Sequence, residues 1–141
     1  MPSTGRRPKI VVSGDGKGLV CQAGGLMLIE TLRVSGMGKG LSEELKAWRL
    51  PRALHDPGKI LTNLAVMLAL GGDCLADVAV LRSSPEIFGP VASDPTISRL
   101  VSALAAAGPK AVRAIRAAWA DLRRAGAGVP PAGPGPVRSR P

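Results

Sequence analysis

The sequence contains very few aromatic residues. Of its 141 residues only Trp48, Phe88 and Trp119 are aromatic, and tyrosine is absent. Domains that stack bases on an aromatic sheet, as the common RNA-binding folds do, need more such rings. The composition therefore argues against that class of nucleic-acid-binding module.

Metal-binding side chains are equally scarce. The two cysteines, Cys21 and Cys74, form no CxxC pair, and His55 is the only histidine. A structural zinc site needs four ligands of this kind, so we do not expect one. The roles of the two cysteines stay open, a disulfide included, but no other feature of the sequence indicates secretion.

The sequence also lacks a long hydrophobic run. The longest apolar stretch, Ile60 to Leu70, is interrupted by Thr62 and Asn63 and is too short to span a bilayer. No apolar segment of the signal-peptide type follows the charges near the N-terminus. We therefore expect a cytoplasmic protein without a membrane partner.

Acidic residues are missing mainly from the two ends of the chain. The formal net charge is +9, and residues 95–141 hold eight Lys or Arg against one acidic residue. Residues 21–94 hold seven basic and eight acidic residues and are nearly neutral. A protein this basic usually contacts a polyanion, and the uneven distribution favours electrostatic contacts at the ends of a scaffold.

The patterns that are present predict a mainly α protein, a small helical bundle. We expect a flexible basic arm over residues 1–8, a helical domain over 9–124 and a disordered Gly/Pro-rich tail over 125–141. A short N-terminal β-hairpin is expected from the β-like run 9–13, the turn at 14–16 and Leu19-Val20. Apolar periodicity predicts six helices, which cover 22–35, 43–48, 57–70, 74–82, 95–104 and 109–124.

Short polar residues before apolar runs suggest helix N-caps. Asp56, followed by Pro57, and Asp94, followed by Pro95, are the clearest candidates, and Ser42 and Asp73 are two more. Asp73, Asp77 and Asp94 could also suggest a metal-binding cluster. We prefer the structural interpretation, in which Asp73 and Asp94 are helix caps and Asp77 lies on an exposed helical face.

The glycine–lysine clusters, His55 and Cys74 could each suggest a functional site, but we interpret them as structural. The glycine–lysine clusters at 14–18 and 36–40 lack the spacing and the Ser or Thr of a phosphate loop, so we interpret both as turns. His55 lies beside a cap and has no nucleophile context, and Cys74 is expected to be a small buried residue.

The helices over 57–70, 74–82 and 95–104 have lengths and links that predict a helix-turn-helix-like trihelical core. In the third helix the apolar residues Ile97, Leu100, Val101 and Leu104 recur at helical spacing. That spacing leaves Thr96, Arg99 and Ala103 on one exposed row, with Ser98 and Ser102 beside it. An ordinary amphipathic surface helix is the alternative interpretation.

A recognition helix of this composition has a clear chemical use. Arg99 is placed to bond a guanine in the major groove, and Thr96 or Ser98 to hold a phosphate near the helix N-terminus. The last helix combines an apolar face (Val112, Ile115, Trp119, Leu122) with Lys110, Arg113 and Arg116, and the N-terminal arm adds Arg6, Arg7 and Lys9. These basic residues are expected to contact the DNA backbone.

Several strings of the sequence resemble a known family. They cover residues 18–25 (GLVCQAGG), 53–59 (ALHDPGK), 71–77 (GGDCLAD) and 88–99 (FGPVASDPTISR). In this order they are similar to the N-terminal portion of DDE-type insertion-sequence transposases of GC-rich bacteria, over roughly residues 9–124. The resemblance implies a helical region joined to a ribonuclease-H-like core, in which three carboxylates bind two Mg²⁺ ions.

The sequence departs from that family after Arg124. The motif with the first catalytic aspartate is expected shortly beyond this point, where Gly/Pro-rich sequence follows instead, so no catalytic residue is carried over. We expect a truncated, DNA-binding transposase fragment that recognises terminal inverted repeats and self-associates. It needs no cofactor of its own, because Mg²⁺ belongs to the full-length members. A transposase-derived regulator or inhibitor, and an interaction module without a DNA role, are the alternatives.

Overall fold

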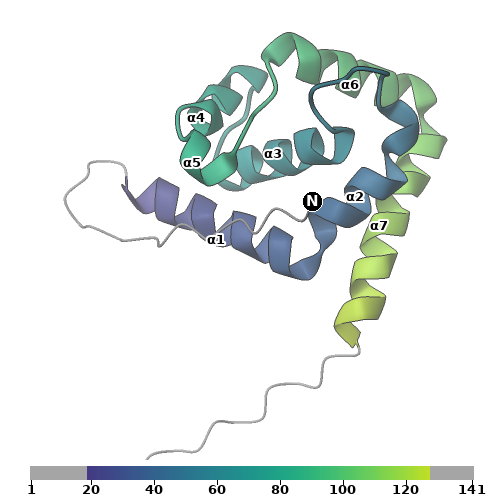
Figure 1. Ribbon diagram of the computed structural model, residues 1–141, viewed down its shortest axis with the longest axis horizontal. Coiled ribbons are helices and arrows are strands. Elements are labelled where there is room, and N and C mark those ends of the chain that lie inside the picture. Colours follow the sequence, from purple (N-terminus) through teal and green to yellow (C-terminus); the bar gives the residue numbers. More distant parts are fainter. Residues whose placement is uncertain (1–18, 128–141) are drawn as a thin grey trace, which may run out of the picture.

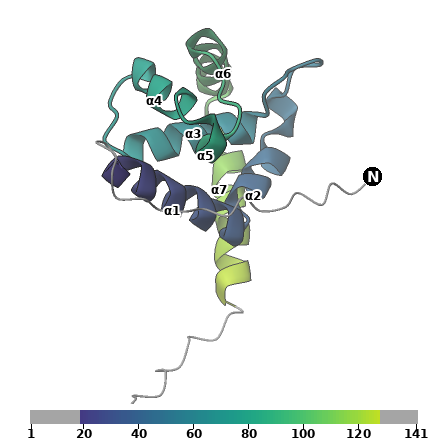
Figure 2. The same cartoon turned by 60° about the vertical axis from the view of Figure 1, so that its left-hand side comes forward.

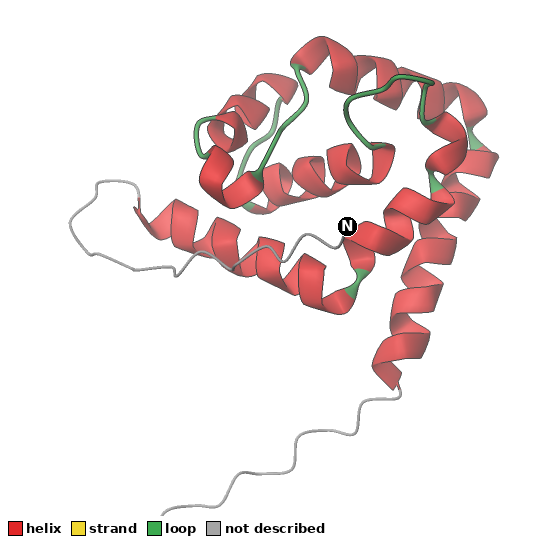
Figure 3. Cartoon of the chain, viewed as in Figure 1, coloured by secondary structure: helices red, strands yellow, loops and turns green. Residues whose placement is uncertain are grey.

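The computed structural model describes residues 19–127, and within that range every regular element is helical (Figures 1 and 3). The elements are α1 (Leu19–Ser35), α2 (Met37–Glu44), η1 (Lys46–Trp48), α3 (Pro57–Ala69), η2 (Leu75–Asp77), α4 (Val78–Arg82), α5 (Pro85–Phe88), α6 (Asp94–Ala107) and α7 (Pro109–Ala127), where η marks a 3-10 helix. The expected mainly α class is therefore confirmed.

The predicted boundaries of the helical region differ from the structure at both ends, and parts of both predicted ends lie outside the described residues. Residues 9–18 of the predicted β-hairpin are outside the described range, and Leu19 and Val20, its expected second strand, begin α1 instead. At the other end α7 continues to Ala127 rather than stopping at Arg124. The rest of the predicted tail, from residue 128 on, is outside the described range.

Helices α2 and α3 make the tightest junction of the fold. A Cβ atom on Gly58 would lie 2.4 Å from the backbone nitrogen of Ser42, so only glycine fits there. The Ser42 hydroxyl donates a 2.6 Å hydrogen bond to Oδ1 of Asp56, which also accepts the backbone N–H of Lys59 at 3.0 Å. Asp56 is thus the N-cap of α3, as predicted, with Pro57 in the first turn.

The expected cap at Ser42 is wrong. Helix α2 begins at Met37, directly after Gly36, whose φ of 75° lies in the left-handed region that favours glycine. Gly38 and Gly40, interpreted as part of a turn, continue the helix. Gly40 lies against α7, where an added Cβ atom would be 3.8 Å from Cβ of Ala118.

The face that α7 buries also differs from the prediction. Ala111 and Ala118 are the buried residues, whereas Val112 and Trp119 keep 46% and 47% of their surface exposed. The distance between packed helices follows the size of the side chains at the contact, and α2 presents a glycine here. Ala118 therefore fills the contact with α2, and Val112 and Trp119 turn toward solvent. Ile115, also from the predicted apolar face, is partly buried against the core, as expected.

Helix α1 covers the far end of α3 through another close contact. A Cβ atom on Gly25 would lie 2.7 Å from Cζ of Phe88, at the end of α5. The ammonium group of Lys59 donates a 2.8 Å hydrogen bond to the carbonyl oxygen of Phe88. Partial burial lowers the pKa of Lys59 from its ordinary value. These contacts join α1, α3 and α5.

The start of α6 is held by an ion pair rather than by the expected cap. Ser93 occupies the N-cap position, and Asp94 lies in the first turn. Oδ1 of Asp94 is 2.8 Å from Nη2 of Arg82, whose Nη1 donates to the carbonyl oxygen of Ala92 at 3.0 Å. This ion pair ties α4 to α6.

The buried face of α6 follows the predicted pattern with one exception. Ile97, Leu100 and Leu104 are buried, as expected, but Val101 is 44% exposed. Its position belongs to the edge of the apolar stripe, where the helix turns toward solvent.

The short turn before α4 uses its residues differently from the prediction. The carboxylate of Asp77 accepts the backbone N–H groups of Asp73 and Cys74, at 2.9 and 3.0 Å. Cys74 is the N-cap of η2 and Asp77 completes a capping box, so Asp73 is not the cap. Cys74 is exposed rather than buried.

The predicted helix-turn-helix-like core is not confirmed. Helix α3 packs mainly against α2, which lies beside it in Figure 2, and α6 contacts α7 and η1. Helix α2 thus has a central place, between α3 and α7. No helix of the described range is long and apolar enough to cross a membrane.

Candidate nucleic-acid interface

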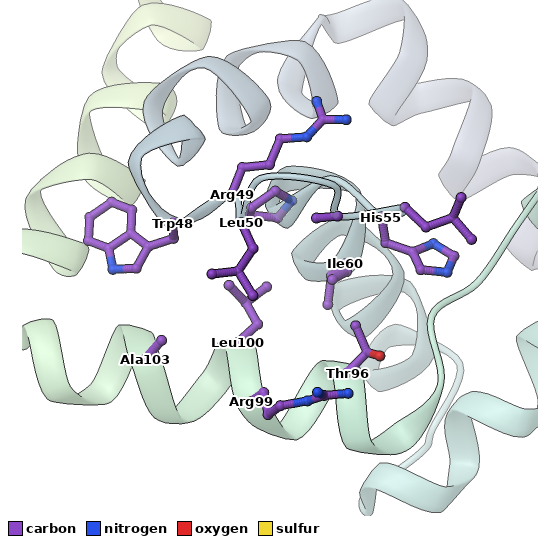
Figure 4. A pocket seen from close by; sticks show the side chains of 12 residues that line it. Trp48, Arg49, Leu50, His55, Ile60, Thr96, Arg99, Leu100 and Ala103 are labelled. Carbon is purple, nitrogen blue, oxygen red and sulfur yellow. The ribbon is translucent and has the colours of Figure 1, made fainter.

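A groove separates α6 from the segment that follows η1. Its volume is about 270 Å³, and Trp48 lies at one end and His55 at the other (Figure 4). The lining residues are mostly apolar, and none is acidic. They are Trp48, Arg49, Leu50, Ala53, Leu54, His55, Pro57, Ile60, Thr96, Arg99, Leu100 and Ala103.

The expected reading row of α6 forms one wall of this groove. Thr96, Arg99 and Ala103 lie on the groove side of the helix (Figure 4). The Nε atom of Arg99 donates to the carbonyl oxygen of Pro95 at 3.1 Å, and the hydroxyl groups of Thr96 and Ser93 are 3.0 Å apart. Arg99 and Ala103 are exposed, as predicted, and Thr96 is half-buried, so the row is an exposed face that also forms a groove wall.

Ser98 occupies a different side of α6. Successive residues of a helix are turned by about 100°, which separates Ser98 from Thr96 and Arg99. Ser98 and Ser102 are both exposed and do not line the groove. The predicted contacts of α6 thus divide between the groove wall and an open polar face.

Lys110 connects α7 to the groove. Its Nζ atom lies 5.8 Å from the centroid of the Trp48 ring, within the range of a cation–π interaction. Lys110 and Arg99 therefore belong to one region, although they come from different helices.

Arg113 and Arg116 continue the basic surface along α7. Both are exposed, and Arg123 lies on the same side, two turns beyond Arg116. Within residues 19–127 none of these three arginines forms an ion pair, whereas Arg124 is paired with Asp121. Arg123 was not among the predicted contacts. Its spacing of seven residues from Arg116 places both on one side of a helix and could have indicated it. Arg6 and Arg7 lie outside the described residues.

Sequence reasoning missed the loop between η1 and α3. Leu54 is 90% exposed and Leu50 69% exposed, and both line the groove. Between them Arg52 has a φ of 69°, which is uncommon for a residue other than glycine. The loop has no periodic pattern, so only its two unpartnered leucines could have drawn attention to it.

The comparison with protein families gives this helical domain its class. The family model described as "Transposase DDE domain group 1" matches residues 2–128, which is most of the chain. The chain therefore belongs to the DDE transposase family. Neither the search of curated proteins nor that of solved structures found a match.

One acidic cluster of the described range is a candidate for a Mg²⁺ site. Ligand atoms of Asp73, Cys74 and Asp77 lie within 4.8 Å of one another. Magnesium prefers oxygen ligands in an octahedron, and one of the three ligands here is a thiol. The Asp77 carboxylate already accepts two backbone N–H groups, which lower its pKa. This turn is better explained as a helix cap.

Proposed function

We propose that this chain binds DNA for a DDE transposase and recognises the terminal inverted repeats of an insertion element. The observation that carries the proposal is the contrast between its cations. Arg33 and Arg82 each lie 2.8 Å from a carboxylate oxygen, of Glu30 and Asp94. In the described range five of the six cations of α6 and α7, namely Arg99, Lys110, Arg113, Arg116 and Arg123, have no such partner, and Arg124 is paired with Asp121. Unpaired cations gathered on one region favour a polyanionic partner.

The side chains have separate roles in this proposal. Arg99 bonds a guanine edge, and Thr96 and Ser98 contact phosphates near the start of α6. Lys110, Arg113 and Arg116 contact the DNA backbone, and Arg6 and Arg7 of the N-terminal arm add to these contacts. Backbone contacts fix the register, and Arg99 supplies sequence preference.

We further propose that residues 19–127 recognise DNA without cutting it. Three of their aspartates have structural partners: Asp56 caps α3, Asp77 completes the capping box of η2, and Asp94 pairs with Arg82. A carboxylate that holds a metal for strand transfer must keep its oxygens available for that ion. Mg²⁺ is therefore assigned to the catalytic core of family members and not to this helical region.

Self-association belongs to the second candidate function, a transposase-derived regulator or inhibitor. It is favoured by Val112 and Trp119, which lie two turns apart on α7 and are each about half exposed. Such a row of apolar side chains can pack against a second helix. Sedimentation of the protein with and without Trp119→Ser measures this directly.

A salt-titrated gel-shift assay tests DNA binding. The probes are a duplex of the element's terminal inverted repeat and the same bases in scrambled order. If about six phosphates are neutralised, the plot of log affinity against log salt has a slope of roughly −5. The double variant Arg113→Ala/Arg116→Ala lowers the magnitude of that slope by about 2.

Arg33→Ala is the matched control, because Arg33 is also an exposed arginine, on α1, but is paired with Glu30. It leaves the slope unchanged. A protein that binds neither duplex at low salt has the third function considered from the sequence, an interaction module without a DNA role. A slope that is the same in all variants removes Arg113 and Arg116 from the DNA contacts.

A further inference from the structure

The loop between η1 and α3 exposes apolar side chains where a folded domain normally hides them. Leu54 is the most exposed large apolar residue of the described range, at 90%. Leu50, on the same loop, is 69% exposed. A single exposed leucine is ordinary, but two of them beside an apolar groove form a surface that fits a partner.

The backbone of the loop holds Leu54 in this exposed position. Arg52 adopts a left-handed conformation, with a φ of 69°, and the N–H of Ala53 donates to the carbonyl oxygen of Leu50 at 3.0 Å. A non-glycine residue in this region carries some strain, which the surrounding structure has to support. The loop is therefore a formed turn.

The groove behind the loop is small and apolar. Leu50, Ile60 and Leu100 supply much of its wall, and its volume of about 270 Å³ is below the usual range for drug-sized ligands. Hydrogen-bonding groups come from Thr96, Arg99 and His55. A planar heterocycle with polar edges suits this combination.

The charges around the groove decide between the candidate occupants. Arg52 lies on the loop, Arg99 on one wall, and Lys110 against Trp48 at one end. No acidic residue lines the groove. A second copy of this chain would bring the same positive charges to the contact, whereas DNA brings negative ones.

We propose that the Leu50–Leu54 loop is a wedge that enters a DNA groove and separates two stacked base pairs, and that the cavity behind it takes the base that is displaced. The proposal rests on the DNA binding proposed above. Leu54 inserts between the base steps, as apolar wedge residues do in proteins that bend DNA. The displaced base lies against Leu100 and Trp48, and its polar edge is the base edge that Arg99 bonds.

A duplex with one extrahelical base tests the wedge. The cost of unstacking a base falls when that base is already unpaired, so a protein that displaces a base binds such DNA more tightly. Fluorescence anisotropy compares the fully paired inverted-repeat duplex with the same duplex that contains one additional unpaired adenine. We expect the wild-type protein to prefer the bulged duplex about tenfold, in line with the value of one base stack.

Two variants remove the wedge and the cavity separately. Leu54→Ala shortens the wedge at a residue whose exposure leaves folding unaffected, and Ala103→Leu fills the groove from the exposed side of α6. In both variants the ratio of the affinity for the bulged duplex to that for the paired duplex falls to nearly one. Val80→Ala is the matched control, because Val80 is an exposed apolar residue of α4 outside the groove, and it keeps the preference.

The outcomes separate this inference from the proposed function. Binding of both duplexes with equal affinity by the wild-type protein overturns the wedge and leaves DNA binding intact. Failure to bind either duplex overturns both. A shift of the Leu54→Ala variant to a smaller species in sedimentation overturns the wedge as well, because the loop then contacts a second copy.

Discussion

The ammonium group of Lys110 lies over the ring of Trp48, with Nζ 5.8 Å from the ring centroid. Trp48 ends the short helix η1, and Lys110 is in the first turn of α7. The two residues therefore join the last helix to the groove along α6. This contact keeps the unpaired cations of α6 and α7 in one region.

Replacing Lys110 by methionine separates the charge from the side-chain volume. A cation–π contact at an exposed position is worth about 0.5–1 kcal/mol, so the free energy of unfolding falls by that amount. If Lys110 also contacts a phosphate, the salt slope of DNA binding decreases in magnitude by about 1. Urea denaturation and salt-titrated binding measure the two effects.

Lys46→Met is the control for this change. Lys46 is an exposed lysine of η1, 3.9 Å from a carboxylate oxygen of Glu43. Its replacement leaves the salt slope at the wild-type value. An equal decrease in both variants contradicts a specific role for Lys110.

Gly58→Ala tests the junction of α2 and α3. The new Cβ atom would lie 2.4 Å from the backbone nitrogen and 2.6 Å from Cα of Ser42, and backbone atoms cannot move away as a flexible side chain can. We expect a loss of about 3 kcal/mol in the free energy of unfolding, at the upper end of the usual cost of overpacking.

Gly126→Ala provides the comparison on α7. Apart from its chain neighbours and the backbone of its own helix, no atom lies within 4 Å of a Cβ atom added at Gly126, and the residue is helical. Alanine favours the helix by up to about 1 kcal/mol, so this variant is at least as stable as the wild type in urea. Similar losses in the two variants contradict the close α2–α3 contact.

Local signals predicted the elements that local chemistry determines. Asp56 followed by Pro57 gave the start of α3, because a cap and a first-turn proline act within a few residues. Ile97, Leu100 and Leu104 gave the buried face of α6 through their spacing. Neither required knowledge of a neighbouring helix.

The remaining features depend on partners distant in the sequence. Ala118 is buried where Gly40 lets α7 approach α2, and hydrophobicity alone ranks Val112 and Trp119 above it. Ser42 resembled a cap, yet its hydroxyl bonds to Asp56 fourteen residues later. In the candidate site, the loop that faces Thr96 and Arg99 has no period from which its position could be predicted.

The turn before α4 should respond to acid through Asp77. Backbone N–H groups of Cys74 and Asp73 hold the pKa of the Asp77 carboxyl below its ordinary value of 3.8. The stabilisation is therefore fully present above the ordinary pKa and is lost as the pH falls through the lowered one. Asp77→Ala lowers the melting temperature at neutral pH, and its difference from the wild type shrinks as the pH is brought below the ordinary value.

Thermal unfolding at a series of pH values measures that difference. Glu86→Ala is the control, since Glu86 is an exposed acidic residue of α5 that takes no part in this turn. The melting temperature of this variant changes with pH in the same way as that of the wild type. A difference between Asp77→Ala and the wild type that is constant with pH rules out the carboxylate as its source.

Arg99→Ala distinguishes base reading from general attraction. Arg99 is exposed on the groove side of α6 and bonds within its own helix, to the carbonyl oxygen of Pro95. If its guanidinium bonds a base in the complex, binding to the inverted repeat weakens by about 1–3 kcal/mol, while binding to the scrambled duplex changes much less. Arg116→Ala removes an equal charge from α7 and is expected to weaken both duplexes alike. An unchanged ratio of the two affinities in Arg99→Ala restricts Arg99 to contacts with the DNA backbone.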